Sequence, residues 1–205
     1  MIIDFSTIKP LQRYHLLTQT IIPRPIAWVL SQNNDADSGY NLAPFSFFNA
    51  ICSDPPLIVL SIGKKSNGDL KDTRRNLLSG REFVVHIASI DQAEALNASA
   101  AELDYGESEL AAMNLSLVDC EGSSVPRLAE ALVAYHCTLY DVHELGPNQQ
   151  AIIYARIHKL HLDDTIVSVE NDRLTIHAAA VNPLARLGAA EFAGIGEPFK
   201  LKRPG

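Results

Sequence analysis

Apolar residues along this chain fall mainly into short, continuous runs, a pattern typical of buried strands. Three such runs cover residues 23–30 (PRPIAWVL), 57–62 (LIVLSI) and 82–89 (EFVVHIAS), and they are rich in β-branched and aromatic side chains. Two longer runs, near 131–143 and 151–162, flank the turn sequence GPNQQ and predict a hairpin. Because strands and helices do not alternate along the chain, the pattern favours an antiparallel, mainly β barrel over a parallel α/β sheet.

Helical spacing is confined to short stretches that would decorate such a barrel. One covers about residues 8–18, and another, LKDTRRNLL, is followed by a stop signal at Gly80. Ser89 and Gln92 have the spacing of a capping box, which predicts an Ala-rich helix up to about residue 102. The sequence QNNDADSG, at 32–39, predicts a turn.

The stretch NLAPFSFFNAICSDPPLIVL, at 41–60, carries prolines where a regular strand would not have them. Pro44 lies inside a strand-like run, and Pro55 and Pro56 precede the next run. Proline lacks the backbone N–H that a ladder needs, so it is expected at a sheet edge, at a bulge or at the start of a strand. Backbone groups left without a strand partner must then bind water or a ligand.

Length, composition and charge exclude several classes of protein. With 205 residues, of which 47% are hydrophobic, the chain is expected to form one domain over residues 1–205. A net charge of −7 argues against a nucleic-acid partner, which would need a basic surface. The N-terminus lacks a signal-peptide pattern, no apolar run approaches the roughly 18 residues of a membrane span, and the three cysteines lie far apart. A cytoplasmic protein with reduced thiols and no membrane partner is therefore expected.

Positive charge is concentrated between residues 64 and 75, which we call the basic segment. It holds five cations against two acids in a chain that is acidic overall, and this favours one compact anion as ligand. A phosphate would find backbone N–H groups at the start of the predicted helix, the charge of Lys71 and the hydroxyl of Thr73, with Asn76 one turn later. The alternative is a solvated surface helix whose Asp72 or Thr73 only caps its own end.

The segment NLAPFSFFN offers contacts for a planar ring. Asn41 and Ser46 are polar, the proline frees neighbouring backbone groups, and the phenylalanines offer flat apolar surface. In a continuous strand, alternation would place Phe45 and Phe47 on one face and Ser46 and Phe48 on the other. The alternative is a half-buried strand whose aromatic side chains belong to the core.

Several common catalytic and cofactor-binding motifs are missing from the sequence. There is no dinucleotide-binding glycine pattern, no nucleophile elbow and no Cys–His spacing of a hydrolase. His158 and His161 are three apart in a predicted strand, so they would point to opposite faces, and no metal site is expected. No side chain is singled out as a catalytic residue.

In this order and spacing, the segments RPIAWV, NLAPFSFFN, DPPLIVLSI, KDTRRN and GREFVV resemble the flavin reductase-like family of FMN-binding proteins. The resemblance continues through VPRLAEALVAYHC to PLARLGAAEFAGIGEPFKLKRP and covers nearly all of the chain from about residue 20. It implies a split β-barrel of Greek-key type that works as a homodimer and binds FMN near the subunit interface. The sequence departs from the family pattern at Ala189, where a glycine is usual, at Phe192, where a tyrosine is frequent, and at His86, where an asparagine is often found.

The resemblance also implies a set of contacts with FMN. The segment around Asn41 would follow the flavin ring and the ribityl chain, the turn at Lys71 would hold the phosphate, and Phe192 would approach the ring from the tail. The cofactor-binding residues expected are Asn41, Ala43, Ser46, Phe47, Ser61, Lys71, Asp72, Thr73, Asn76 and Phe192.

The activity that the resemblance implies is that of an FMN-dependent oxidoreductase, in which NAD(P)H passes a hydride to flavin N5. Reduced flavin would then leave for an oxygenase partner or stay to reduce another acceptor. Two alternatives remain open at the level of sequence. One is a non-enzymatic electron carrier that binds FMN but not NAD(P)H, and the other is a flavin-free interaction domain.

Overall fold

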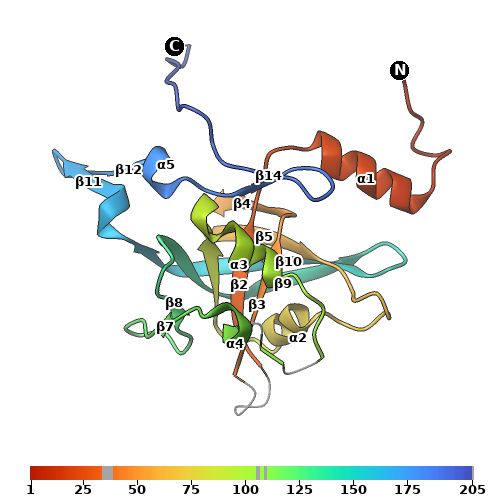
Figure 1. Cartoon of the computed structure of the whole chain (residues 1–205), viewed down its shortest axis with the longest axis horizontal. Helices are drawn as coiled ribbons and strands as arrows, with labels where there is room; N and C mark the ends of the chain where they lie inside the picture. Colours follow the sequence, from red (N-terminus) through yellow and green to blue (C-terminus); the bar gives the residue numbers. More distant parts are fainter. Residues whose placement is uncertain (34–38, 105–106, 109, 205) are drawn as a thin grey trace.

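The computed structural model describes residues 1–33, 39–104, 107–108 and 110–204. Its largest element is a seven-stranded antiparallel sheet with the strand order β3-β2-β6-β9-β10-β5-β4 (Figure 1). The strands are β2 (Ala27–Gln32), β3 (Tyr40–Phe45), β4 (Phe48–Ser53), β5 (Pro56–Ile62), β6 (Phe83–Ile87), β9 (Val133–Leu145) and β10 (Gln150–Leu162). β9 and β10 pair along nearly their whole length, which confirms the predicted hairpin.

Chain connectivity forces this sheet to curl into a barrel. β3 and β4 lie at opposite ends of the strand order, yet only Ser46 and Phe47 separate them in the chain. Neighbouring strands lie roughly 4.8 Å apart, so a two-residue link cannot cross a flat sheet of this width. The two edges approach each other: β3 contacts β5, and the backbone N–H of Ser61 donates to the Phe47 carbonyl at 2.9 Å. The mainly β barrel predicted from the apolar pattern is confirmed.

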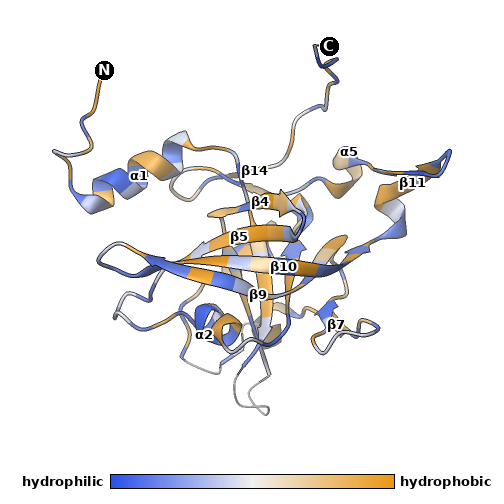
Figure 2. Cartoon of the chain, turned by 180° about the vertical axis from the view of Figure 1, so that it is seen from behind, coloured by the Kyte–Doolittle hydropathy of each residue, from blue (hydrophilic) through white to orange (hydrophobic). Residues whose placement is uncertain are grey.

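The continuous apolar run in β2 arises because both of its faces are buried. Val29 packs inside the barrel with Val85, whereas Trp28 packs on the outer face with Leu96 of α3 (Ala93–Ala98). The Trp28 indole N–H donates to the Ser99 hydroxyl at 2.8 Å, which fixes the end of α3 against the barrel. Figure 2 shows the apolar residues concentrated along these central strands.

The predicted helices are present, with shifted ends. The helices of the structure, besides α3, are α1 (Pro10–Thr20), α2 (Asp72–Leu78), α4 (Leu110–Met113), α5 (Ala178–Val181) and the short 3₁₀ turns η2 (Ile90–Gln92) and η3 (Asp164–Ile166). The capping box of Ser89 and Gln92 is confirmed, and it opens η2. α3 ends at Ala98 rather than near residue 102, because the Ser99 hydroxyl donates to the Leu96 carbonyl and accepts from Trp28.

The predicted strand at 23–30 is divided in two. β1 (Arg24–Pro25) pairs with β13 (Ala185–Arg186), which pairs with β14 (Phe192–Ala193), and these three form a separate small sheet. This small sheet brings the C-terminal tail beside the segment that enters β2. Two further strand pairs are β7 (Leu117–Val118) with β8 (Arg127–Leu128) and β11 (Val167–Glu170) with β12 (Arg173–Ile176).

Two expectations remain, one about a turn and one about membrane-spanning helices. The predicted turn at 32–39 falls mostly on residues 34–38, outside the described residues. Among the residues that the structure describes, no helix is both long and apolar enough to cross a membrane.

Candidate cofactor site

Three hollows in the surface meet at Pro44, on the edge strand β3. The α2 hollow is lined by Asn41, Ala43, Pro44, Phe45, Lys65, Lys71, Asp72, Thr73 and residues 99–103. The β5 hollow is lined by Tyr14, Pro44, Phe45, Ser46, Phe47, Ser61, Gly63, Lys64, Lys71 and Gln150. The tail hollow is lined by Tyr14, Ile26, Pro44, Ser46, Leu96, Asn97, Ala100, Arg186 and Phe192.

The volumes of the hollows indicate that one ligand would occupy more than one of them. Their volumes are about 90, 270 and 220 Å³ in the order given, whereas a small-molecule site usually encloses roughly 300 Å³ or more. Each pair of hollows shares lining residues, so a ligand of nucleotide size would span at least two of them. We refer to the three together as the groove.

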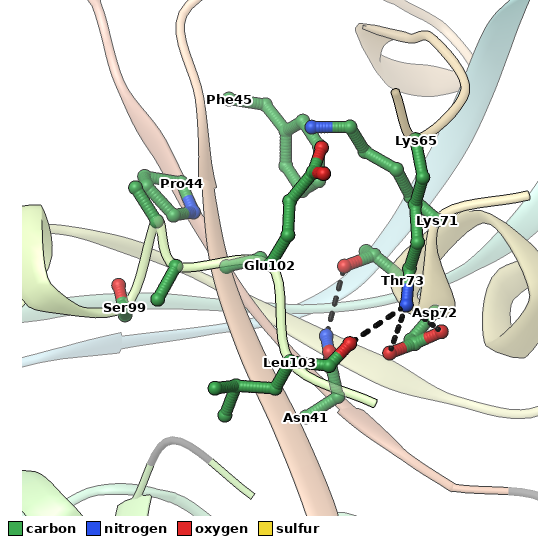
Figure 3. Close-up of a pocket in the computed structure, with 13 residues that line it drawn as sticks. Asn41, Pro44, Phe45, Lys65, Lys71, Asp72, Thr73, Ser99, Glu102 and Leu103 are labelled. Carbon is green, nitrogen blue, oxygen red and sulfur yellow. Dashed lines mark hydrogen bonds and ion pairs between the residues drawn. The ribbon is translucent and has the colours of Figure 1, made fainter. Parts of the chain in front are cut away.

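The α2 hollow is built by a contact between the edge strand and the start of α2 (Figure 3). The Asn41 amide donates to the Thr73 hydroxyl at 2.8 Å, and both side chains are buried. Lys65 neutralises Asp72, with an Nζ–Oδ1 distance of 3.2 Å, and also donates to the Leu103 carbonyl at 3.0 Å. Lys71 instead extends toward Phe45. Within the described part of the chain, no carboxylate lies within 4.0 Å of its ammonium.

This arrangement has the chemistry of an anion site. The α2 hollow is lined by two lysines and two acids, Asp72 and Glu102, and the adjoining β5 hollow adds Lys64. Together the two hollows hold three cations against two acids, which leaves a net positive charge in this part of the groove. The positive charge predicted for the basic segment therefore faces a cavity rather than only solvent.

Nine of the ten predicted cofactor residues line the groove, and Asn76 does not. Its amide donates to the Ser31 hydroxyl at 3.1 Å and to Asn33 Oδ1 at 3.0 Å, behind α2 and against β2. Asn76 thus holds the helix to the barrel. The residues that do line it are Asn41, Ala43, Ser46, Phe47, Ser61, Lys71, Asp72, Thr73 and Phe192.

Pro44 lies where the sequence indicated. β3 is an edge of the sheet, with Pro44 opposite Trp28 of β2, so the missing N–H interrupts no central ladder. The alternation expected for Phe45 and Phe47 is wrong, because the strand stops at Phe45 and a new one begins at Phe48. Phe45 is 8% exposed and packs in the core, where it also borders the α2 and β5 hollows, whereas Phe47 is 39% exposed at the β5 hollow.

Several residues that line the groove were not predicted from the sequence. Tyr14 reaches the groove from α1, where its ring lies 6.4 Å from that of Phe47. Gln150 is the first residue of β10, and its side-chain amide donates to the Ser61 hydroxyl at 2.9 Å. Arg186 is the first residue of RLGAAEF in the tail sequence PLARLGAAEF, and its place in this family-like segment is the one hint in the sequence.

Replacing Thr73 by valine should lower the free energy of unfolding by about 1–3 kcal/mol, because the buried Asn41 amide loses its acceptor. Serine at this position keeps the hydroxyl and should retain most of the stability. Urea unfolding of the two variants checks this. A valine variant as stable as the unaltered chain would contradict the contact.

Known proteins share both this sequence and this fold. The family model of the flavin reductase like domain matches residues 19–177. The solved structure of nitrilotriacetate monooxygenase component B from Bacillus cereus is 35% identical, covers 98% of both chains and gives a TM-score of 0.88. That of 2-nitrobenzoate 2-nitroreductase from Pseudomonas fluorescens is 27% identical, covers 100% of this chain and 96% of its own, and gives a TM-score of 0.87.

A third solved structure, from Shewanella frigidimarina, has a split barrel domain. It is 18% identical, covers 100% of both chains and gives a TM-score of 0.83, which establishes the likeness of fold. The family match extends over most of the chain and includes β3, α2 and the strands around them. The chain therefore belongs to the flavin reductase-like family and has its split β-barrel fold.

Proposed function

We propose that this chain is an oxidoreductase that binds FMN in the groove and reduces it with NAD(P)H. The observation that carries the proposal is the pairing of a cationic end, at Lys71, with a length of edge-strand backbone at β3. A phosphate group needs the first, and the polar rim of a planar ring needs the second. Family membership and the two oxidoreductase names among the similar structures support the same reading.

The residues present fit FMN at the phosphate end. Lys71 supplies charge and Thr73 a hydroxyl in the α2 hollow, and Ser61 lines the β5 hollow together with Lys71. Asp72 and Glu102 would repel a phosphate if they were alone, but Lys65 neutralises Asp72, and Lys64 and Lys71 outweigh Glu102, whose carboxylate accepts from the Ser66 hydroxyl. From this end, the segment Asn41–Ser46 would follow the ribityl chain and the ring.

The chemistry that FMN supplies when bound is the acceptance of a hydride at N5 from the nicotinamide of NAD(P)H. The contribution of the chain is to position and enclose. Phe47 and Tyr14 offer ring faces in the β5 hollow, Phe192 offers one in the tail hollow, and Ser46 offers a hydroxyl that both hollows share. No side chain is assigned an acid–base step.

The proposal includes a cytoplasmic homodimer. Large apolar side chains of α1 are exposed in the single chain, among them Leu11 at 66% and Ile21 just after its end at 59%, and a second copy would cover them. Cys52, Cys120 and Cys137 are all free, as a reducing compartment requires. The likeness to a monooxygenase component supports an oxygenase as the partner that takes reduced flavin.

The visible absorption spectrum of the purified protein, followed by anaerobic titration with NADH and NADPH, tests the function. We expect a flavin spectrum that either nucleotide bleaches rapidly. A bound flavin that neither nucleotide bleaches would indicate an electron carrier instead. Protein that stays colourless and binds no added FMN would overturn the proposal.

A further inference from the structure

Two arginines lie side by side at the tail hollow, the one part of the groove that Lys71 does not line. Arg24 in β1 pairs in register with Arg186 in β13. Arg24 is 6% exposed, and its guanidinium donates to the carbonyl oxygens of Thr18, Ile21 and Leu187. All of these partners are neutral.

Arg186 lines the tail hollow itself. Its guanidinium lies over the Phe192 ring, 4.4 Å from the centroid, and one of its N–H groups donates to the Ala189 carbonyl at 2.5 Å. Over the described residues, no carboxylate lies within 4.0 Å of Arg24 or Arg186. Burial lowers the pKa of Arg24, and the charge of Arg186 lowers it further against an opposing effect of Tyr14.

Two adjacent cations without an acid make this end of the groove attractive to an anion. The buried arginine also reaches the cavity, since its Nε donates to the Ser46 hydroxyl at 3.4 Å, and Ser46 lines the tail hollow. The groove therefore has positive charge in the tail hollow as well as beside Lys71, whereas FMN carries only one phosphate.

The remaining walls of the tail hollow are apolar and partly flat. Ile26, Leu96 and Pro44 form one part, the rings of Tyr14 and Phe192 another, and Asn97 adds one amide. The tail hollow has a volume of about 220 Å³ and joins the other two hollows at Pro44, so a small organic molecule bound there would also border the rest of the groove. Flat apolar walls with one guanidinium at the rim select a planar molecule that bears an anionic group.

Resting on the proposed function, we propose that the tail hollow binds the second reactant of the flavin and that Arg186 recognises its anionic group. The ligand class is a planar organic anion. Its charge is a carboxylate if the ligand is an electron acceptor and a phosphate if the ligand is the nicotinamide donor. Arg24 acts as a positioning residue, because it holds the Ser46 hydroxyl and adds its charge behind Arg186.

Calorimetric titration with benzoate and with its neutral analogue benzamide tests the inference. With FMN-saturated protein, benzoate should bind at least about tenfold more tightly than benzamide. Arg186→Gln should remove most of this difference, Arg186→Lys should keep part of it, and Arg173→Gln, an exposed arginine on β12, should keep all of it. Equal binding of the two probes, or a difference that survives Arg186→Gln, would overturn the inference.

Two further measurements separate the possible explanations. The FMN affinity of Arg186→Gln shows whether this end holds the cofactor's own phosphate, and a loss as large as that caused by Lys71→Ala would overturn the inference. The benzoate titration is repeated without FMN, so that it still decides the anion preference if FMN binding, and with it the proposed function, fails. Competition of benzoate with NADH for unaltered protein would assign the anion to the donor, and non-competitive inhibition would assign it to the acceptor.

Discussion

Replacing Lys71 by alanine should weaken FMN binding by roughly tenfold to hundredfold. The ammonium of Lys71 faces the α2 hollow with no carboxylate within 4.0 Å among the described residues. A hydrogen bond from such a cation to a phosphate contributes about 1.5–3 kcal/mol, and this range gives the expected loss. Titration of FMN against the protein, followed by flavin fluorescence, measures it.

Riboflavin provides the decisive control, because it carries the same ring and ribityl chain without the phosphate. Lys71→Ala should leave riboflavin affinity nearly unchanged, so the preference for FMN over riboflavin should collapse in this variant. Lys200→Ala, in the exposed C-terminal tail, is the matched charge control and should alter neither affinity. Equal losses for FMN and riboflavin would place Lys71 near the ring instead, and no loss at all would remove it from the site.

The candidate site could be predicted where its residues lie close together in the sequence. The basic segment and the NLAPFSFFN segment each have a chemical character that is readable without the fold. What the sequence does not encode directly is that Asn41 and Thr73, 32 positions apart, share a hydrogen bond. That contact depends on α2 packing over the edge of the barrel, which is set by the whole strand order.

The differences from the sequence-based expectations have the same physical origin. Asn76 lies three residues after Thr73, close to the same helix face, but its amide donates to Ser31 of β2 and it does not line the groove. Alternation failed for Phe47 because the chain changes strand at Ser46, a break that no periodicity announces. Arg186 and Tyr14 reach the groove through long-range packing of the tail and of α1. Hairpins and caps were predicted correctly because their determinants are neighbours in sequence.

His86 makes the stability of the fold depend on pH. It is fully buried in β6, where its Nδ1–H donates to the Trp28 carbonyl and its Nε2 accepts from the Leu128 backbone N–H, both at 3.1 Å. Both ring nitrogens are thus satisfied in the neutral form. A second proton, on Nε2, would face the Leu128 N–H donor. Burial, together with the charges of His136, Arg127 and His161, lowers the pKa of His86 to about 3.

Acidification should destabilise the fold well before the carboxylates titrate. Between the folded pKa of about 3 and the unfolded value of 6.5, the unfolded chain binds a proton at His86 that the folded chain does not. Stability therefore falls as the pH drops through this window, in total by on the order of 5 kcal/mol, of which about 2 kcal/mol is lost between pH 6.5 and 5. Burial also lowers the pKa of His136 and of His161, so their contributions have the same sign. Urea unfolding at several pH values in this upper range measures the slope.

The variant His86→Asn isolates the contribution of this one ring. Its amide can still donate toward the Trp28 carbonyl, but the Leu128 N–H loses its acceptor, so the variant should be less stable at pH 7 by about 1–3 kcal/mol. Since asparagine does not titrate, its stability should change less than that of the unaltered chain between pH 6.5 and 5. The exposed His143→Asn serves as the control and should keep the original slope, because it lies on the surface of β9. If His86→Asn kept the slope as well, the pH dependence would belong to His136 and His161, and the buried ring of His86 would not be its source.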